Sequence, residues 1–359
     1  MENKSNAGKI LLIVSFILTG LGVMLLFSAS KGITSARTGL PVYIKQMIWV
    51  FLGSLLFIWL KDFDYRHWNK IAGILYFVCF ILLLIVLATG TGRAGRWIKI
   101  GWLNFQPSEF TKFVLIILLA RYFSTKDIEK FSTLLGGIII TGIPFLLILI
   151  QPNLGTAFLL IVIFFTMAYL AGARKNHLLI LIIIGILMSP FLWMGLKDYQ
   201  KQRLMVFVNP WKDPLGKGYN ILQSKITIGS GGIIGKGFLR GTQTKLAFLP
   251  EYHTDFIFCL LAEEFGLVGV LVLLFLYYVF LTQIWKISMT TQDPFGRLIG
   301  MGVMVMFLIQ IFVNIGMACG LLPVAGIPLP FLSYGGSALL VCFISLATVY
   351  NLHKNTALF

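Results

Sequence analysis

The stretch GSGGIIGKGFLRGTQTKLAFLPEYHTD, residues 229–255, is the densest glycine-rich and polar passage of this chain. Its glycines permit left-handed backbone and close approach to a ligand, and Lys236, Arg240 and Lys245 add positive charge. A carboxylate, Asp255, follows where apolar sequence resumes. Glycine turns, cations and one acid beside an apolar segment favour a site for an anionic, phosphorylated substrate.

This stretch ends a long polar loop, residues 197–255, that is rich in lysine and arginine. Only Asp198, Asp213 and Glu251 offset these cations before Asp255. Solvation of an exterior loop beside anionic headgroups would explain any single cation, whereas an anionic substrate better explains the cluster. Helical spacing of apolar residues between positions 218 and 228 predicts a short amphipathic helix on the membrane surface.

The composition of the rest of the chain is that of an integral membrane protein. Hydrophobic residues make up 58% of the sequence, charged residues only 12%, and the mean hydropathy is +0.90. We therefore predict an all-α polytopic protein, one domain over residues 1–359, with about ten transmembrane helices. The predicted spans are residues 10–29, 42–60, 69–89, 109–123, 134–150, 154–171, 177–196, 256–285, 297–319 and 335–352. The first is expected to be an uncleaved span, because its apolar run is longer than that of a signal peptide.

The distribution of lysine and arginine in the short connections predicts the orientation. Basic residues gather in the connections near positions 61–70, 121–130, 174–175 and 286–297 and at both termini. The positive-inside rule places this face, and both termini, in the cytoplasm. The loop 197–255 then lies on the extracytoplasmic side. Its own cations do not overturn this orientation, because long loops escape the rule.

Proline-rich sequence within apolar surroundings indicates a cavity. Pro323, Pro328 and Pro330 interrupt the segment from Leu322 to Ser333. Irregular backbone at membrane depth is tolerated only where protein or a wet cavity satisfies its polar groups. We expect this cavity to open outward.

Asp255 is the leading candidate for chemistry, because a carboxylate at the edge of a membrane domain is costly. The structural alternative is a helix start, with Thr254 as N-cap and Asp255 in the first turn. On the fourth predicted span, Glu109 and Lys112 share a face; they form either a weak exposed ion pair or, inside a bundle, part of a substrate path. Glu263, like its neighbour Glu264, is expected to bridge to a cation.

Several kinds of site have no signature in this sequence. It contains no P-loop, no His-Glu-x-x-His, no nucleophile elbow and no His or Cys cluster with metal-ligand spacing. What remains is acid–base chemistry by carboxylates, with cations stabilising an anion.

Five ordered motifs resemble the SEDS family of bacterial cell-wall proteins, above all its elongation branch. They are residues 106–112, 151–157, 229–258, 262–266 and 322–336. The resemblance implies a ten-helix bundle in the bacterial inner membrane that polymerises lipid II into glycan strands and releases undecaprenyl diphosphate. It also implies a class B penicillin-binding transpeptidase as partner, together with other elongation-complex proteins and membrane lipids, and no nucleic acid.

The family's essential loop aspartate corresponds to Asp255, and its fourth-span acid and lysine correspond to Glu109 and Lys112. The family usually has aspartate where this chain has Asn153, so a carboxylate there cannot be required for this protein's chemistry. As a hypothesis, Asp255 deprotonates the acceptor hydroxyl, which attacks the anomeric carbon with inversion.

Further candidates would bind the substrate rather than transfer its proton. Lys112, Lys236, Arg240 and Lys245 are candidates for stabilising the diphosphate, and Gly232 and Ser333 for other substrate contacts. A divalent cation, Mg²⁺ or Mn²⁺, could share the first task, although no ligand cluster argues for one. Two other functions remain open: a lipid II flippase, which also needs a polar cavity and cations, and a non-catalytic scaffold.

Overall fold

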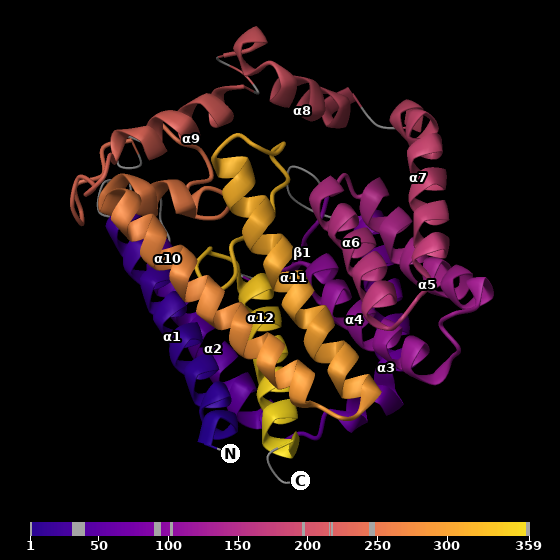
Figure 1. The fold of residues 1–359 in the computed structure, drawn as a ribbon. Coiled ribbons are helices and arrows are strands. Elements are labelled where there is room, and N and C mark those ends of the chain that lie inside the picture. The colour runs from indigo at the N-terminus through magenta and orange to yellow at the C-terminus, as the bar shows by residue number, and fades with distance from the viewer. Residues whose placement is uncertain are drawn as a thin grey trace.

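A computed structural model describes residues 2–30, 40–89, 95–100, 103–195, 198–214, 216, 218–243 and 248–356. Helices dominate the fold (Figure 1). They are α1 (Glu2–Ser30), α2 (Val42–Leu60), α3 (Arg66–Thr89), α4 (Pro107–Thr125), α5 (Phe131–Ile150), α6 (Leu154–Leu170), α7 (Lys175–Gly195), α8 (Asp198–Val208), α9 (Tyr219–Ser230), α10 (Ile257–Thr290), α11 (Pro294–Ala318) and α12 (Gly336–Thr356), with a short 3-10 helix, η1 (Pro210–Lys212).

Each of the ten predicted spans coincides with one of these helices, α1 to α7 and α10 to α12. Among the described residues, seven helices are long and apolar enough to cross a membrane: α1, α2, α3, α5, α10, α11 and α12. Two further apolar helices fall short of that length over residues 154–170 of α6 and 175–191 of α7. In α4, Glu109, Lys112 and Arg121 lower the hydropathy. The chain is thus a multi-pass helical protein, and a crossing by all ten remains a prediction.

The helices pack as one bundle around α4. This helix contacts α3, α5, α6, α11 and α12, and it is buried on nearly every face. At the periphery, α1 packs against α10, and α2 packs against α12. The helix α7 contacts only its neighbour α6 to any extent, and most of its apolar side chains are exposed, as expected of a lipid-facing helix.

The large loop lies at the end of the bundle opposite to both termini (Figure 1). The amphipathic helix predicted near 218–228 is confirmed as α9, which packs against α10 and α11. The helix α8 was not predicted, because its apolar residues do not gather in a clear stripe.

A small antiparallel hairpin is a second departure from the all-α prediction. The strands β1 (Ile98–Ile100) and β2 (Leu103–Phe105) pair with Ile98 opposite Phe105. Strands of three residues are too short for alternation to be read in the sequence.

The helix α10 is divided by a break at Gly266, two residues after the second of its two glutamates. Gly266 has φ 62° and ψ −159°, outside the helical region, so residues 257–265 form a separate first segment. This conformation is accessible to glycine and strained for other residues. The first segment of α10 carries Glu263 and follows Asp255 directly, so it connects the loop to the bundle.

Candidate functional site

Asp255 lies in a turn of residues 251–256 that precedes α10. The carbonyl oxygen of Glu251 accepts hydrogen bonds from the backbone N–H groups of Thr254, Asp255 and Phe256, at 3.2, 3.1 and 3.4 Å. Glu251 has φ 55°, a left-handed conformation that costs energy for a residue with a side chain. The helix begins only at Ile257, with Phe256 as N-cap. The alternative of Thr254 as N-cap is therefore wrong, and Asp255 is not part of a helical turn.

Two buried side chains from other segments fix this turn. Asn314, in α11, donates from Nδ2 to the carbonyl oxygen of Asp255 at 3.0 Å and to that of Ile327 at 2.7 Å. Ser333 donates from Oγ to the carbonyl oxygen of Thr254 at 2.6 Å. Because Ser333 is buried and fully engaged with backbone groups, it holds the proline-rich segment against the turn.

The proline-rich segment borders a cavity of about 310 Å³. Its lining is mostly apolar and combines the start of α6, α8, α11 and the proline-rich segment: Leu154, Gly155, Phe158, Arg203, Val313, Leu322, Pro323, Val324, Ala325 and Ile327. A Cβ atom added to Gly155 would lie 2.4 Å from the carbonyl oxygen of Ala325, so only glycine allows this contact. One added to Gly326 would lie 3.6 Å from Oδ2 of Asp255. A cavity therefore borders this segment as expected, its opening outward stays a prediction, and the carboxylate of Asp255 lies against the segment.

The surroundings of Asp255 raise its pKa from the ordinary value of 3.8 to about 6. Burial is the largest cause, and the negative charge of Glu251 adds to it. Arg203 and Arg96 act in the opposite direction. Arg96 also donates to the carbonyl oxygens of Gln151 and Pro152, at the motif that precedes α6.

Glu109 and Lys112 form an ion pair in the interior of the bundle. Lys112 Nζ lies 2.7 Å from Glu109 Oε2, and the residues are 1% and 3% exposed. Of the two alternatives for this pair, the weak exposed one is excluded. A buried pair of this kind is strongly destabilised when one partner is removed, because the other charge remains without compensation.

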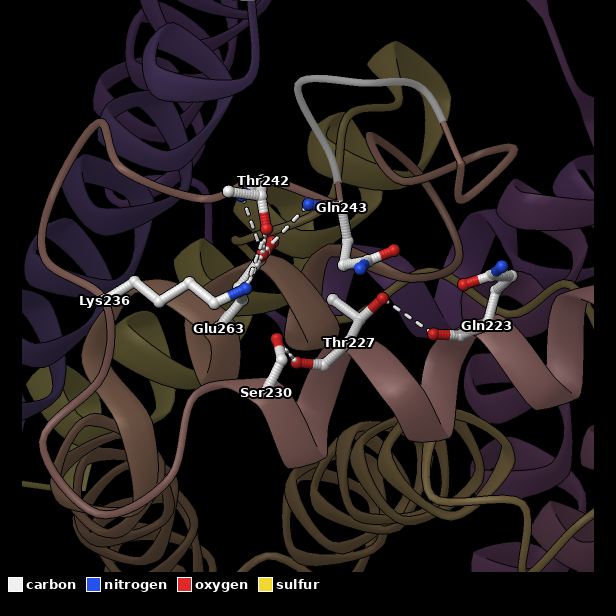
Figure 2. A network of polar contacts seen from close by, with 7 residues as sticks. All are labelled: Gln223, Thr227, Ser230, Lys236, Thr242, Gln243 and Glu263. Atoms are coloured by element: carbon white, nitrogen blue, oxygen red, sulfur yellow. Dashed lines mark hydrogen bonds and ion pairs between the residues drawn. The ribbon is translucent and has the colours of Figure 1, made fainter.

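Lys236 also has a carboxylate partner. Its Nζ lies 2.7 Å from Oε1 of Glu263, a fully buried residue (Figure 2). The predicted bridge from Glu263 to a cation is therefore confirmed. The same oxygen accepts hydrogen bonds from Thr242 N at 2.7 Å, Thr242 Oγ1 at 3.1 Å and Gln243 N at 2.9 Å. The glycine-rich stretch is therefore attached to α10 through one carboxylate oxygen.

The other predicted loop contacts are more open. Arg240 and Gly232 are exposed, and Gly232 has φ 56°, a conformation that favours glycine. Lys245 falls outside the residues that the structure describes.

At the second motif, Asn153 caps α6 and accepts a hydrogen bond from Thr156 N, a role that asparagine fills as well as aspartate. In the described parts of the chain, no three His, Cys, Asp or Glu side chains are grouped as metal ligands.

Asn314 and two arginines, Arg96 and Arg203, belong to the site although they were not predicted as site residues. A single asparagine inside an apolar span was the available signal for Asn314, since buried polar groups need partners. Arg203 is one of many cations in the large loop, and Arg96 lies outside that loop in the sequence. Only the fold shows that the charges of both arginines reach Asp255.

Comparisons with known proteins agree with this architecture. Residues 9–358 match the profile of a family described as cell cycle protein FtsW/RodA/SpoVE. Peptidoglycan glycosyltransferase MrdB of Escherichia coli K12 is 39% identical over 337 residues, 92% of this chain and 91% of the relative.

Two solved structures superpose on nearly the whole chain. A chain of a peptidoglycan synthase complex that coordinates polymerization and crosslinking superposes with a TM-score of 0.81 and 31% identity, over 96% of this chain and 97% of that one. A D255A mutant of Rod shape determining protein RodA from Thermus thermophilus superposes with a TM-score of 0.72 and 28% identity, over 96% of both chains. Since the family profile and a curated relative each span more than nine tenths of the sequence, the chain belongs to the FtsW/RodA/SpoVE family, the SEDS proteins.

Proposed function

We propose that this chain is a peptidoglycan glycosyltransferase that polymerises lipid II into glycan strands for cell elongation and rod shape. The 39% identity to MrdB over 92% of the chain supports the activity. The observation that carries the mechanism is the position of Asp255, a carboxylate with a raised pKa beside a mostly apolar cavity.

In the proposed reaction Asp255 is the general base. It removes the proton from the 4-hydroxyl of the acceptor sugar, whose oxygen forms a bond to the anomeric carbon of the donor. The bond from that carbon to the diphosphate breaks on the opposite face, so the configuration inverts and undecaprenyl diphosphate leaves. A pKa near 6 suits this role, because the carboxylate is more basic than a free aspartate and is still ionised at neutral pH.

The leaving diphosphate needs positive charge close to the reacting carbon. Arg96 and Arg203 are now the favoured candidates, since their charges already act on Asp255. Lys112 and Lys236 remain proposals of lower rank, because each has a carboxylate partner within 2.7 Å. Arg240 and Lys245 also remain proposals. A divalent cation could arrive with the diphosphate itself, whose oxygens are ligands that Mg²⁺ prefers.

The apolar cavity would accommodate part of the lipid carrier. Its wall is formed by the start of α6 and the proline-rich segment, and Arg203 places a charge in the same lining. An amphiphilic substrate with an anionic headgroup fits such a mixed lining. We place this site on the extracytoplasmic face of the inner membrane, because the predicted orientation puts the cationic short connections inside.

A class B penicillin-binding transpeptidase is the proposed partner. The structural neighbour from a complex that coordinates polymerization and crosslinking supports this assignment. Cross-linking needs newly made strands, so a polymerase and a transpeptidase that bind each other would act on the same strand. Other elongation proteins and membrane lipids are proposed as further partners.

The deciding experiment is lipid II polymerisation by the purified protein with its transpeptidase, resolved on a gel that separates glycan strands. We expect strands from wild type and none from Asp255→Ala. A parallel assay would measure transport of lipid II across liposome membranes. If neither variant made strands while wild type alone moved lipid II, the flippase would replace the polymerase.

A further inference from the structure

The contact between Glu263 and the glycine-rich stretch has no assigned part in the reaction. Oε1 of the fully buried Glu263 accepts four hydrogen bonds (Figure 2). Two come from the backbone N–H groups of residues 242 and 243, and two from the side chains of Lys236 and Thr242. A buried carboxylate satisfied in this way binds its donors firmly, since charge-assisted hydrogen bonds are about twice as strong as neutral ones. Glu263 is not available to touch substrate, because it is 0% exposed.

Backbone hydrogen bonds attach the same loop to the break in α10. Lys236 N donates to Glu263 O at 3.0 Å, and Leu267 N donates to Gly232 O at 3.0 Å. A Cβ atom on Gly235 would lie 2.2 Å from the carbonyl oxygen of Glu264, so the two backbones touch directly. These bonds do not depend on the Glu263 side chain. Removing its charge should therefore loosen residues 242–243 without detaching the whole loop.

The carboxylate contact closes a ring of chain that contains Asp255. The ring runs from Gln243, through the turn of residues 251–256, to Glu263 on the first segment of α10. On one side the turn is held by Asn314 and Ser333. On the other side, the incoming chain is held at Gln243, which also accepts a hydrogen bond from Phe248 N at 3.1 Å.

We propose that Glu263 is a positioning residue for glycan polymerisation, which fixes the chain entering the catalytic turn so that Asp255 stays aligned with the acceptor hydroxyl. The inference rests on the proposed polymerase activity. It also gives Lys236 a different role: the lysine completes the anchor of the loop and does not bind diphosphate. Misplacing a catalytic group by about 1 Å can cost about 100-fold in rate, so a loosened ring should lower turnover.

The test compares Glu263→Gln, Lys236→Met and the double variant in the polymerisation assay with the transpeptidase present. Glutamine keeps the shape and the acceptor oxygen, so the fold should survive. We expect kcat to fall about 10-fold in each single variant and KM for lipid II to stay within about two-fold. The double variant should be no slower than the slower single variant, because both changes break one anchor. The matched control is Glu129→Gln, which removes the exposed ion pair with Arg174, 2.8 Å long, and should leave kcat unchanged.

Limited trypsin digestion reports the loop itself. Cleavage after Lys236 and Arg240 should be faster in Glu263→Gln than in wild type or Glu129→Gln, while the unfolding temperature stays similar. Additive losses in the double variant, or a raised KM in Lys236→Met alone, would show that Lys236 touches substrate and would overturn the proposal. Unchanged kcat in Glu263→Gln despite faster cleavage would overturn it as well. Absence of strands from wild type would instead refute the polymerase assignment.

Discussion

Replacing Asp255 by asparagine should stabilise the protein while abolishing polymerisation. The folded-state pKa of Asp255 is about 6, against 3.8 for the free side chain. The folded state therefore binds the proton more tightly, so its stability is highest at low pH and falls as the pH rises through 3.8 towards 6. Above pH 6 the carboxylate is ionised in the folded protein, and the full free-energy cost of burying its charge lowers the stability. That cost is at most about 3 kcal/mol, from 2.2 pKa units at 1.36 kcal/mol each.

Asparagine has nearly the same shape and carries no charge, so it escapes this cost. Because Asp255 is only half-buried, solvent reduces the gain, and we expect a rise in unfolding temperature on the order of 2 to 4 °C at pH 7.5. At pH 4.5 the gain should shrink to about a third, since the wild-type carboxylate is then protonated in the folded state. Polymerisation should fall by about 10² to 10⁴-fold at pH 7.5.

The assay is thermal unfolding of detergent-purified protein at both pH values, with strand synthesis measured on the same samples. Glu129→Gln is the control, because Glu129 is an exposed carboxylate whose ion pair with the exposed Arg174 lies outside the site, so this change should shift neither quantity. A variant Asp255→Asn that is less stable than wild type at pH 7.5 would refute the argument from desolvation. Retained strand synthesis would refute the assignment of Asp255 as the base.

Three further changes test other parts of the site. Lys112→Met should destabilise the protein by about 3 to 5 kcal/mol, because it leaves the buried carboxylate of Glu109 uncompensated. Adding Glu109→Gln should recover much of the lost unfolding temperature, and equal unfolding temperatures of Lys112→Met and wild type would contradict this reasoning. Arg203→Gln should move the acidic limb of the pH–rate profile for strand synthesis to higher pH, because Arg203 lowers the pKa of Asp255. An acidic limb at the wild-type pH would show that the charge of Arg203 does not reach Asp255. Gly155→Ala should lower stability by about 1 to 3 kcal/mol and reduce polymerisation, because the added Cβ would lie 2.4 Å from the carbonyl oxygen of Ala325. The unfolding temperature measures the loss of stability, and the yield of glycan strands measures the loss of polymerisation.

The arrangement of spans was predictable, because apolar runs of membrane length dominate the sequence. All ten predicted ranges fall on helices, and the amphipathic spacing near 218–228 corresponds to α9. The helix α8 and the hairpin of β1 and β2 were not predicted, since neither carries a periodic signal of sufficient length. The range 109–123 was predicted as well and falls on α4, although Glu109, Lys112 and Arg121 lower the hydropathy of that helix.

The chemistry of the candidate site was predictable in part. The sequence marked Asp255 and the cation excess of its loop, because charges next to membrane spans are costly. It did not reveal that residues distant in the chain hold the turn. The hydrogen bonds of Asn314 and Ser333 join three segments whose contact depends on the packing of α10, α11 and the proline-rich segment. Such contacts leave no local pattern.

The roles of the cations follow from whether the bundle already satisfies them. A lysine that lies 2.7 Å from a buried carboxylate already has its charge compensated by that partner, and moving it fully onto a diphosphate would leave the carboxylate buried without compensation. This penalty applies to both Lys112 and Lys236. Within the described part of the chain, Arg203 forms no ion pair, and it lines the cavity beside the proline-rich segment. An arginine there can bind two phosphate oxygens at once without breaking an existing bond. The anionic headgroup should therefore bind on the side of α8, and the glycine-rich stretch should serve chiefly to hold the catalytic turn.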